Sequence, residues 1–215
     1  MTVAPPAVRT GAHVLVEALE AHGVEVVFGL PGIHALPLWD ALIGSPIRRV
    51  VVRHEQAAGF GAVGYARTGE KPGVYLTSTG PGAFNSLVAL SEADASSAPV
   101  LHLTSQIPTD LVGAGRGYLH ESRGQSQAFA AVSRFHARPT TPEALAAAVA
   151  EAFARMTLDP GPATIEIATD VMAAPAPEGP LPVARVTLPA PDPEAIVRVR
   201  AMLEESEACP SRCRS

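Results

Sequence analysis

Glu55 is the residue whose type and position point most directly to chemistry. It follows an apolar run rich in β-branched residues, 50–52, and precedes a segment, 56–67, made largely of alanine and glycine. A carboxylate where a strand ends and a helix begins lies at the edge where open α/β sheets bind ligands. Two interpretations are open: a helix-start charge favoured by the helix dipole, or an acid–base group that faces a ligand.

A glycine-proline-glycine turn is the second feature with chemical potential. Gly80-Pro81-Gly82 follows a predicted strand, 73–78, and Asn85 lies in the first turn of the next helix. Glycine permits unusual backbone angles and lets a ligand touch the main chain. Taken alone, the motif is also typical of an ordinary tight turn. Because two strand ends of this kind occur in successive strand–helix units, we favour one shared ligand site.

Helices and strands that would position these residues alternate along the chain. Apolar periodicity therefore predicts an α/β fold, with a mainly parallel sheet and helices on both faces. The predicted strands are 24–28, 48–53, 73–78, 99–104 and 163–168, and the predicted helices are 11–22, 35–43, 56–67, 83–95 and 141–156.

The residues around both strand ends resemble the pyrimidine-binding domain of thiamine diphosphate enzymes, in particular the acetolactate synthase-like branch. The resemblance covers about residues 9–172 and implies the thiamine diphosphate-binding fold and cofactor. It rests on Arg53-His54-Glu55, Gly64-Tyr65-Ala66-Arg67, Thr79-Gly80-Pro81-Gly82 and Asn85, together with segments 11–19, 23–32 and 159–171.

Roles for individual residues are implied by this resemblance. Glu55 would hydrogen-bond the aminopyrimidine ring of the cofactor and so promote loss of the thiazolium C2 proton. The implied reactions are decarboxylation or carboligation of 2-keto acids such as pyruvate, by transferases and lyases that include enzymes of branched-chain amino acid biosynthesis. The implied cofactor-binding residues are Pro31, Gly32, Glu55, Gly80, Pro81, Gly82 and Asn85.

A glycine-rich segment, 105–126, is predicted to be a loop, and loops of this length in compact domains are typically functional or disordered. Acetolactate synthases carry a Gln-Glu pair here near the reactive end of the cofactor, whereas this chain has His120-Glu121. Imidazole titrates in the physiological range, so His120 is expected to be either a catalytic proton donor or a solvated loop residue. This departure argues against acetolactate synthesis in the strict sense, and Arg134 in place of a family lysine is a second, milder departure.

Four parts make up the predicted domain plan: an N-terminal tail (1–8), the pyrimidine-binding domain (9–172), a proline-rich linker (173–191) and the start of a truncated central domain (192–215). The sequence has no Gly-Asp-Gly motif of the family's diphosphate half, so no metal ligand is predicted. Mg²⁺, and FAD if it is used, would bind to the missing domains. We expect a chain that is inactive by itself; the alternative is a non-catalytic protein, or a subunit that pairs with a separate diphosphate-binding chain.

Composition limits the choice of partners. A net charge of -5 without a basic stripe argues against nucleic acid. No apolar run approaches the ~20 residues of a membrane helix, and the N-terminus lacks the pattern of a signal peptide, so a cytoplasmic protein is expected. Cys209 and Cys213 are expected to be unpaired thiols of the tail. A homo-oligomer is expected, with the small-residue face at Ala57, Ala58, Gly61 and Ala62 meeting a neighbouring subunit.

Overall fold

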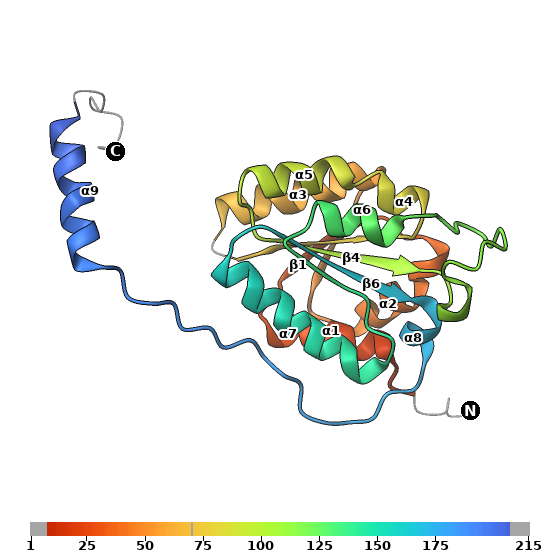
Figure 1. Cartoon of the computed structure of the whole chain (residues 1–215). Helices are drawn as coiled ribbons and strands as arrows, with labels where there is room; N and C mark the ends of the chain where they lie inside the picture. The colour runs from red at the N-terminus through yellow and green to blue at the C-terminus, as the bar shows by residue number, and fades with distance from the viewer. Residues whose placement is uncertain (1–7, 70, 207–215) are drawn as a thin grey trace. The chain divides into compact units, whose positions relative to one another are not determined.

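A parallel sheet with helices on both faces forms the main body of the protein (Figure 1). The computed structural model describes residues 8–69 and 71–206. Its strands are β1 (Val26–Gly29), β2 (Arg48–Val51), β3 (Gly73–Thr77), β4 (Val100–Gln106), β5 (Phe135–Ala137) and β6 (Pro162–Ala168). They are arranged in the order β2-β1-β3-β4-β6-β5, and every neighbouring pair is parallel. The predicted α/β fold class is confirmed.

The helices divide between the two faces of this sheet (Figure 1). One face carries α1 (Gly11–Ala21), α2 (Leu36–Ala41), α7 (Pro142–Leu158) and α8 (Thr169–Ala173). The other carries α3 (Glu55–Thr68), α4 (Pro81–Phe84), α5 (Leu87–Ala95) and α6 (Gln125–Ala131). Short 3₁₀ helices lie at Ile33–Ala35, Leu42–Gly44 and Thr109–Leu111. No helix in the described part of the chain is long and apolar enough to cross a membrane.

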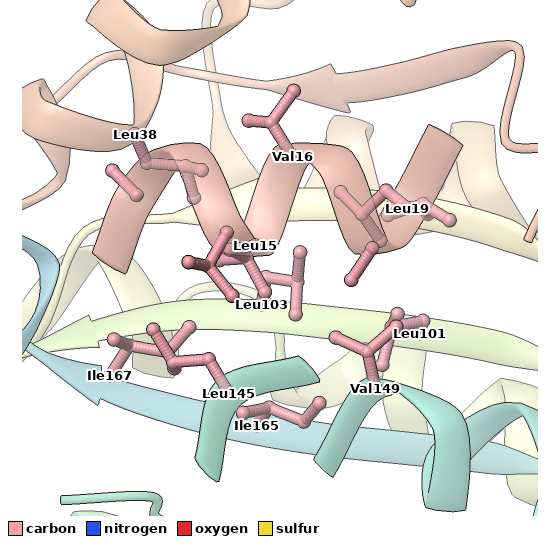
Figure 2. Close-up of a cluster of buried hydrophobic side chains, with 14 of the residues drawn as sticks. Leu15, Val16, Leu19, Leu38, Leu101, Leu103, Leu145, Val149, Ile165 and Ile167 are labelled. Atoms are coloured by element: carbon pink, nitrogen blue, oxygen red, sulfur yellow. The ribbon is translucent and has the colours of Figure 1, made fainter. Parts of the chain in front are cut away.

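The larger core cluster lies between the sheet and the pair α1 and α7. Figure 2 shows Leu15 and Leu19 of α1, together with Leu145 of α7, directed at strand residues such as Leu101. All four side chains are fully buried. The spacing of four residues between Leu15 and Leu19 places one apolar stripe of α1 on the sheet. Burial of each such side chain contributes about 1.5–3 kcal/mol, so these helices anchor the β4–β6 half of the sheet.

Most of the small-residue face of α3 packs inside this chain. Ala58 and Ala62 are fully buried in the second core cluster. A Cβ added to Gly59 would lie 2.5 Å from the Cβ of Ala89 in α5, and one added to Gly61 would lie 2.8 Å from the ring of Phe28. Small residues are therefore needed because α3 lies close to its own sheet and to α5. Of the residues predicted to meet a neighbouring subunit, Ala58 and Ala62 are buried within this chain, whereas Ala57 is exposed, and the subunit contact itself stays a prediction.

The predicted elements match the structure except at a few places. The predicted helix 83–95 is divided into α4 and α5, because Ser86 is buried and its Oγ donates to the Ala83 carbonyl (2.8 Å) instead of facing solvent. Strand β5 was not predicted, since its three half-buried residues show no alternation. The predicted loop 105–126 includes the last residues of β4, a 3₁₀ turn and the start of α6.

The first part of the proline-rich segment lies against the domain. Gly11 donates its backbone N–H to the Ala174 carbonyl (3.0 Å), and Ala176 donates to the Arg9 carbonyl (2.9 Å). Ala184 donates to His22 Nε2 (2.9 Å). Residues up to Arg185 belong to this unit, and a second unit begins at Val186, whereas the sequence placed the boundary near 172.

The second unit contains helix α9 (Pro193–Glu205), for which Asp192 is the N-cap. Its side chain accepts a hydrogen bond from the backbone of Glu194 (3.0 Å) and so caps the helix. The predicted domain boundaries stay predictions, and Cys209 and Cys213 lie outside the described residues.

Candidate functional site

Glu55 and Asn85 meet at the carboxyl edge of the sheet. Glu55 opens α3 directly after β2, and Asn85 follows α4 after β3. Asn85 Nδ2 donates a hydrogen bond of 2.9 Å to Glu55 Oε2. A Cβ built on Gly82 would lie 3.0 Å from Glu55 Oε1, so the turn passes close to the second carboxylate oxygen. The structure thus brings together Glu55, Gly82 and Asn85, which come from two different strand ends.

His54 explains how α3 begins at this point. Its Nδ1 accepts a hydrogen bond of 3.2 Å from the backbone of Gln56 and so caps the helix. The carboxylate of Glu55 lies in the first turn, where the helix dipole favours a negative charge. Glu55 therefore has the helix-start position that one interpretation requires, while the contact with Asn85 directs its side chain toward β3.

The glycine-proline-glycine turn has a shape that only glycine permits. Gly80 has φ +66°, and a Cβ at this position would lie 2.6 Å from the carbonyl oxygen of His120. A Cβ on Gly32 would lie 2.4 Å from the Cβ of Ser78. The loops after β1, β3 and β4 therefore touch here through glycine. Pro31, next to Gly32, is exposed, and Pro81 occupies the first turn of α4.

Gln125, which was not predicted from the sequence, holds the glycine-proline-glycine turn in place through hydrogen bonds. Its side-chain oxygen accepts hydrogen bonds from Gly80 N (2.7 Å) and from Thr79 Oγ1 (2.8 Å). Its amide nitrogen donates to Glu166 Oε2 (2.8 Å). Gln125 is 2% exposed, so these bonds are screened little by water. The only signal in the sequence was a glutamine directly after a glycine at a helix start.

Glu166, in the middle of β6, is a fully buried carboxylate. It accepts hydrogen bonds from Gln106 (3.0 Å) and Gln125 (2.8 Å), and His136 Nε2 lies 2.6 Å from Oε1. Burial by itself raises the pKa of Glu166, but hydrogen bonds, the strongest from His136, outweigh this and leave the pKa below its usual value. A lone acidic residue inside an apolar strand was the signal that could have found it.

Two imidazoles lie beside the turn. His120 has φ +63°, a conformation that is uncommon for a residue other than glycine and is concentrated at functional sites. Its ring centroid is 5.3 Å from that of His34, which is 5% exposed and was not predicted. Burial lowers the pKa of His34, nearby His120 lowers it further, and a backbone hydrogen bond with Leu119 acts in the opposite direction. His34 is consequently a neutral imidazole at physiological pH.

Several buried polar atoms of this region have no partner among the described residues: Ser78 Oγ, His34 Nε2 and His120 Nδ1. Buried polar atoms are nearly always hydrogen-bonded, to protein, water or a ligand. The glycine cradle, Ser78 Oγ and the Glu55 carboxylate fit a flat heterocycle that carries ring nitrogens and an amino group, and the two imidazole nitrogens lie next to it. Among residues 8–69 and 71–206, no group of three or more His, Cys, Asp or Glu is placed to hold a metal.

The topology explains why these loops converge. Strand β1 leads to helices on one face of the sheet, whereas β3 leads to helices on the other. At such a switch point the two connections diverge and leave a crevice outside the carboxyl ends of the strands. The residues from 29 to 32 and from 78 to 82 border this crevice.

Arg134 and Glu121, which the sequence analysis compared with residues of acetolactate synthases, both stabilise the fold through hydrogen bonds or ion pairs. Arg134 pairs with Asp94 (2.8 Å) and Asp159 (2.7 Å) and so joins the start of β5 to two helix ends. Glu121 accepts backbone hydrogen bonds from Gly115 (2.7 Å) and Tyr118 (3.1 Å) and folds its own loop.

Comparison with known proteins agrees with this geometry. Residues 9–130, more than half of the chain, match the family described as "Thiamine pyrophosphate enzyme, N-terminal TPP binding domain". A probable 2-ketoarginine decarboxylase of Pseudomonas aeruginosa is 43% identical over 172 residues, which are 80% of this chain and 31% of that protein.

Acetolactate synthase large subunits are similar as well. The probable one of Methanocaldococcus jannaschii is 37% identical over 75% of this chain and 27% of that protein. The one of Corynebacterium glutamicum is 36% identical over 78% of this chain and 27% of that protein. The chain spans less than a third of the length of these relatives. Over its matched residues, the chain belongs to the family of N-terminal thiamine pyrophosphate-binding domains.

Proposed function

We propose that this chain provides the pyrimidine-binding half of the active site of a thiamine diphosphate-dependent enzyme acting on 2-keto acids. The observation that carries the proposal is the contact of Glu55 with Asn85 beside Gly82, at a crevice of the sheet edge. When bound, the cofactor supplies an electron sink for cleavage of the bond next to a keto group. Its aminopyrimidine ring is the part for which the residues of this chain are suited.

Glu55 is the proposed acid–base residue. Asn85 holds Oε2, which leaves Oε1 to hold or share a proton with a ring nitrogen. Because Gly82 has no side chain, the ring can approach the main chain beside this oxygen. Gln125 is a positioning residue, since it holds Gly80 but does not border the crevice at Glu55.

His120 and His34 are proposed to lie at the substrate end of the site. As a neutral imidazole, His34 can donate one hydrogen bond and accept another. His120 contacts Gly80 and faces His34, so it is placed to pass a proton to a substrate intermediate. Their roles are separate from that of Glu55, which acts on the pyrimidine.

Decarboxylation is the reaction that we favour. The relative with 43% identity is named a probable 2-ketoarginine decarboxylase, whereas the acetolactate synthases quoted above are 36–37% identical over similar lengths. His120 in place of the glutamine of acetolactate synthases points the same way. A 2-keto acid with a long cationic side chain is therefore the first substrate to test. Pyruvate and acetolactate synthesis are the second candidate, which the synthase relatives favour.

The diphosphate, its Mg²⁺ and any FAD are proposed to bind outside these residues, on another segment or chain. We accordingly expect no decarboxylase or synthase activity from the isolated chain.

A cytoplasmic homo-oligomer is also proposed. Phe60 and Val88 are 40% and 59% exposed beside an apolar groove between α3, α5 and α6, and self-association would cover them. In sedimentation, Val88→Asp should shift the chain toward monomer, whereas Val199→Asp in α9 should not.

Binding of thiamine to the chain tests the proposed site without requiring the second half. In ¹⁵N-resolved NMR, thiamine should shift the Asn85 side-chain amide and the Gly82 backbone amide. Glu55→Gln should weaken binding about tenfold, the usual loss for one hydrogen bond to a charged group. Glu151→Gln, an exposed change in α7, is the matched control. Equal affinity of the Glu55 and Glu151 variants would contradict the assignment of Glu55.

A further inference from the structure

A second crevice opens at the same edge of the sheet, between β4 and β6. Strand β4 leads to α6 on one face, whereas β6 leads to α8 on the other, so the strand connections diverge here as they do between β1 and β3. Figure 1 shows both strands ending at this edge, near α8 and the loop after β4. A cavity of about 510 Å³ lies here, a volume typical of a site for a small molecule.

The inner part of the cavity is lined by polar side chains. Gln106 and Gln125 line it from buried positions, and His136 lies beside them. Glu166 holds His136 through Nε2 at 2.6 Å, so the orientation of the imidazole is fixed by a carboxylate that is itself fully buried. Such carboxylate–imidazole pairs hold the ring rigidly in one orientation.

Two guanidinium groups complete the lining. Arg123 comes from the loop before α6, and Arg138 follows β5. Neither forms an ion pair with a carboxylate of the described residues, a property they share with other exposed arginines such as Arg48. The acidic group beneath this site, Glu166, already accepts three side-chain hydrogen bonds. Among the described residues, the guanidinium groups of Arg123 and Arg138 therefore have no carboxylate partner, which leaves them available to an oxyanion.

We propose that this cavity binds a small molecule through a carboxylate or phosphate group. Arg123 and Arg138 bind the oxyanion. His136 donates a hydrogen bond to the ligand, or accepts one from it, at the inner end of the cavity. A guanidinium presents paired N–H donors that match both kinds of oxyanion. The lining does not include Glu55, Gly82 or Asn85, and Gln125 lies between the two regions, with its oxygen on Gly80 and its nitrogen on Glu166.

Titration of the 215-residue chain with inorganic phosphate and with malonate tests the site. At physiological ionic strength, at least one probe should bind by calorimetry and shift the ¹⁵N resonances of His136. Arg123→Gln and Arg138→Gln should each weaken binding about tenfold, as expected when one charge-assisted contact is lost. Arg48→Gln, an exposed change on the edge strand β2, is the matched control and should leave the affinity unchanged.

The two probes separate the sources of the ligand. Tighter binding of phosphate identifies a phosphate ester as the ligand class, and tighter binding of malonate identifies a carboxylic acid. No binding of either probe, or equal affinity in all three arginine variants, would overturn the proposal. Thiamine should not compete with the probe, because its proposed site lies on the other side of Gln125, and competition would also count against a separate site.

Discussion

Two glutamates lie at the two crevices of one sheet edge, and their surroundings are opposite. Glu55, at the β1/β3 crevice, is half-buried and is held by one amide, that of Asn85. Glu166, below the β4/β6 cavity, is fully buried and is contacted by Gln106, Gln125 and His136. The same residue type thus occurs once with a free oxygen and once with both oxygens occupied.

The difference shows how a carboxylate is suited to different tasks. A buried carboxylate with several donors is rigid, and hydrogen bonds inside the protein stabilise its charge. A carboxylate with one donor keeps an oxygen available for a ligand and can exchange a proton with it. We therefore assign Glu55 to ligand chemistry and Glu166 to positioning, through Gln125 toward Gly80 and through His136 toward the second cavity.

Replacement of the Glu55 carboxylate should have the largest effect on the first chemical step. With a matching diphosphate-binding region co-expressed, Glu55→Gln keeps the size of the side chain but cannot share a proton. Hydrogen–deuterium exchange at the thiazolium C2 should slow by about 10²–10⁴-fold, the usual contribution of positioned acid–base catalysis. Pro81→Ala, which alters only the turn, should slow exchange less. Exchange of the Glu55 variant at the parent rate would mean that the carboxylate is only a helix-start charge.

Removal of Glu166 should affect stability instead. Glu166→Ala leaves His136 and two buried amides without their acceptor, and breaking a buried pair of this kind costs about 3–5 kcal/mol. Urea denaturation measures this free energy of unfolding. Glu151→Ala, whose partner Arg155 is exposed on the same helix surface, should cost at most about 0.5 kcal/mol. Similar losses for the two variants would remove the distinction drawn between Glu55 and Glu166.

The contrast also marks how much could be predicted from the sequence. Glu55, Gly82 and Asn85 each stand at a strand end, which is a local pattern, and their placement at one edge is a consequence of a parallel sheet. Gln125 gains its role from Thr79 and Glu166, which lie 46 and 41 residues away in the chain. No local pattern reports such contacts. The alanines of α3 were similarly visible as small, but the sequence did not show that α5 would cover them.

Acidification should lower the free energy of unfolding in two pH ranges, one set by His102 and one by Glu166. Burial lowers the pKa of His102, a fully buried residue of β4, to about 3. In the unfolded chain His102 has its ordinary pKa of about 6.5, so it binds a proton below that pH, whereas in the folded chain it stays neutral. The free energy of unfolding should therefore fall by about 2 kcal/mol between pH 7 and pH 5. The pKa of Glu166 is lowered, so its contribution is present above about pH 4.3 and is lost as the pH falls further.

Urea denaturation over this pH range checks both groups. Glu166→Gln should flatten the acid limb below about pH 4.3 and leave the fall between pH 7 and pH 5 unchanged. If the variant instead flattens only the upper part of the profile, Glu166 is not the ionised group below the second cavity.

His120→Gln should have the smallest effect on the first chemical step and should act on the later ones. The side chain lies on the His34 side of Gly80, whereas Glu55 contacts the turn at Gly82. In the co-expressed assembly, C2 exchange should therefore stay within about threefold of the parent rate, well below the loss expected for a positioned acid–base group. The ratio of aldehyde to carboligation product from a 2-keto acid should change, because protonation of the substrate intermediate competes with its transfer. A loss of C2 exchange as large as that of Glu55→Gln would place His120 at the pyrimidine and break the separation between the two ends of the site.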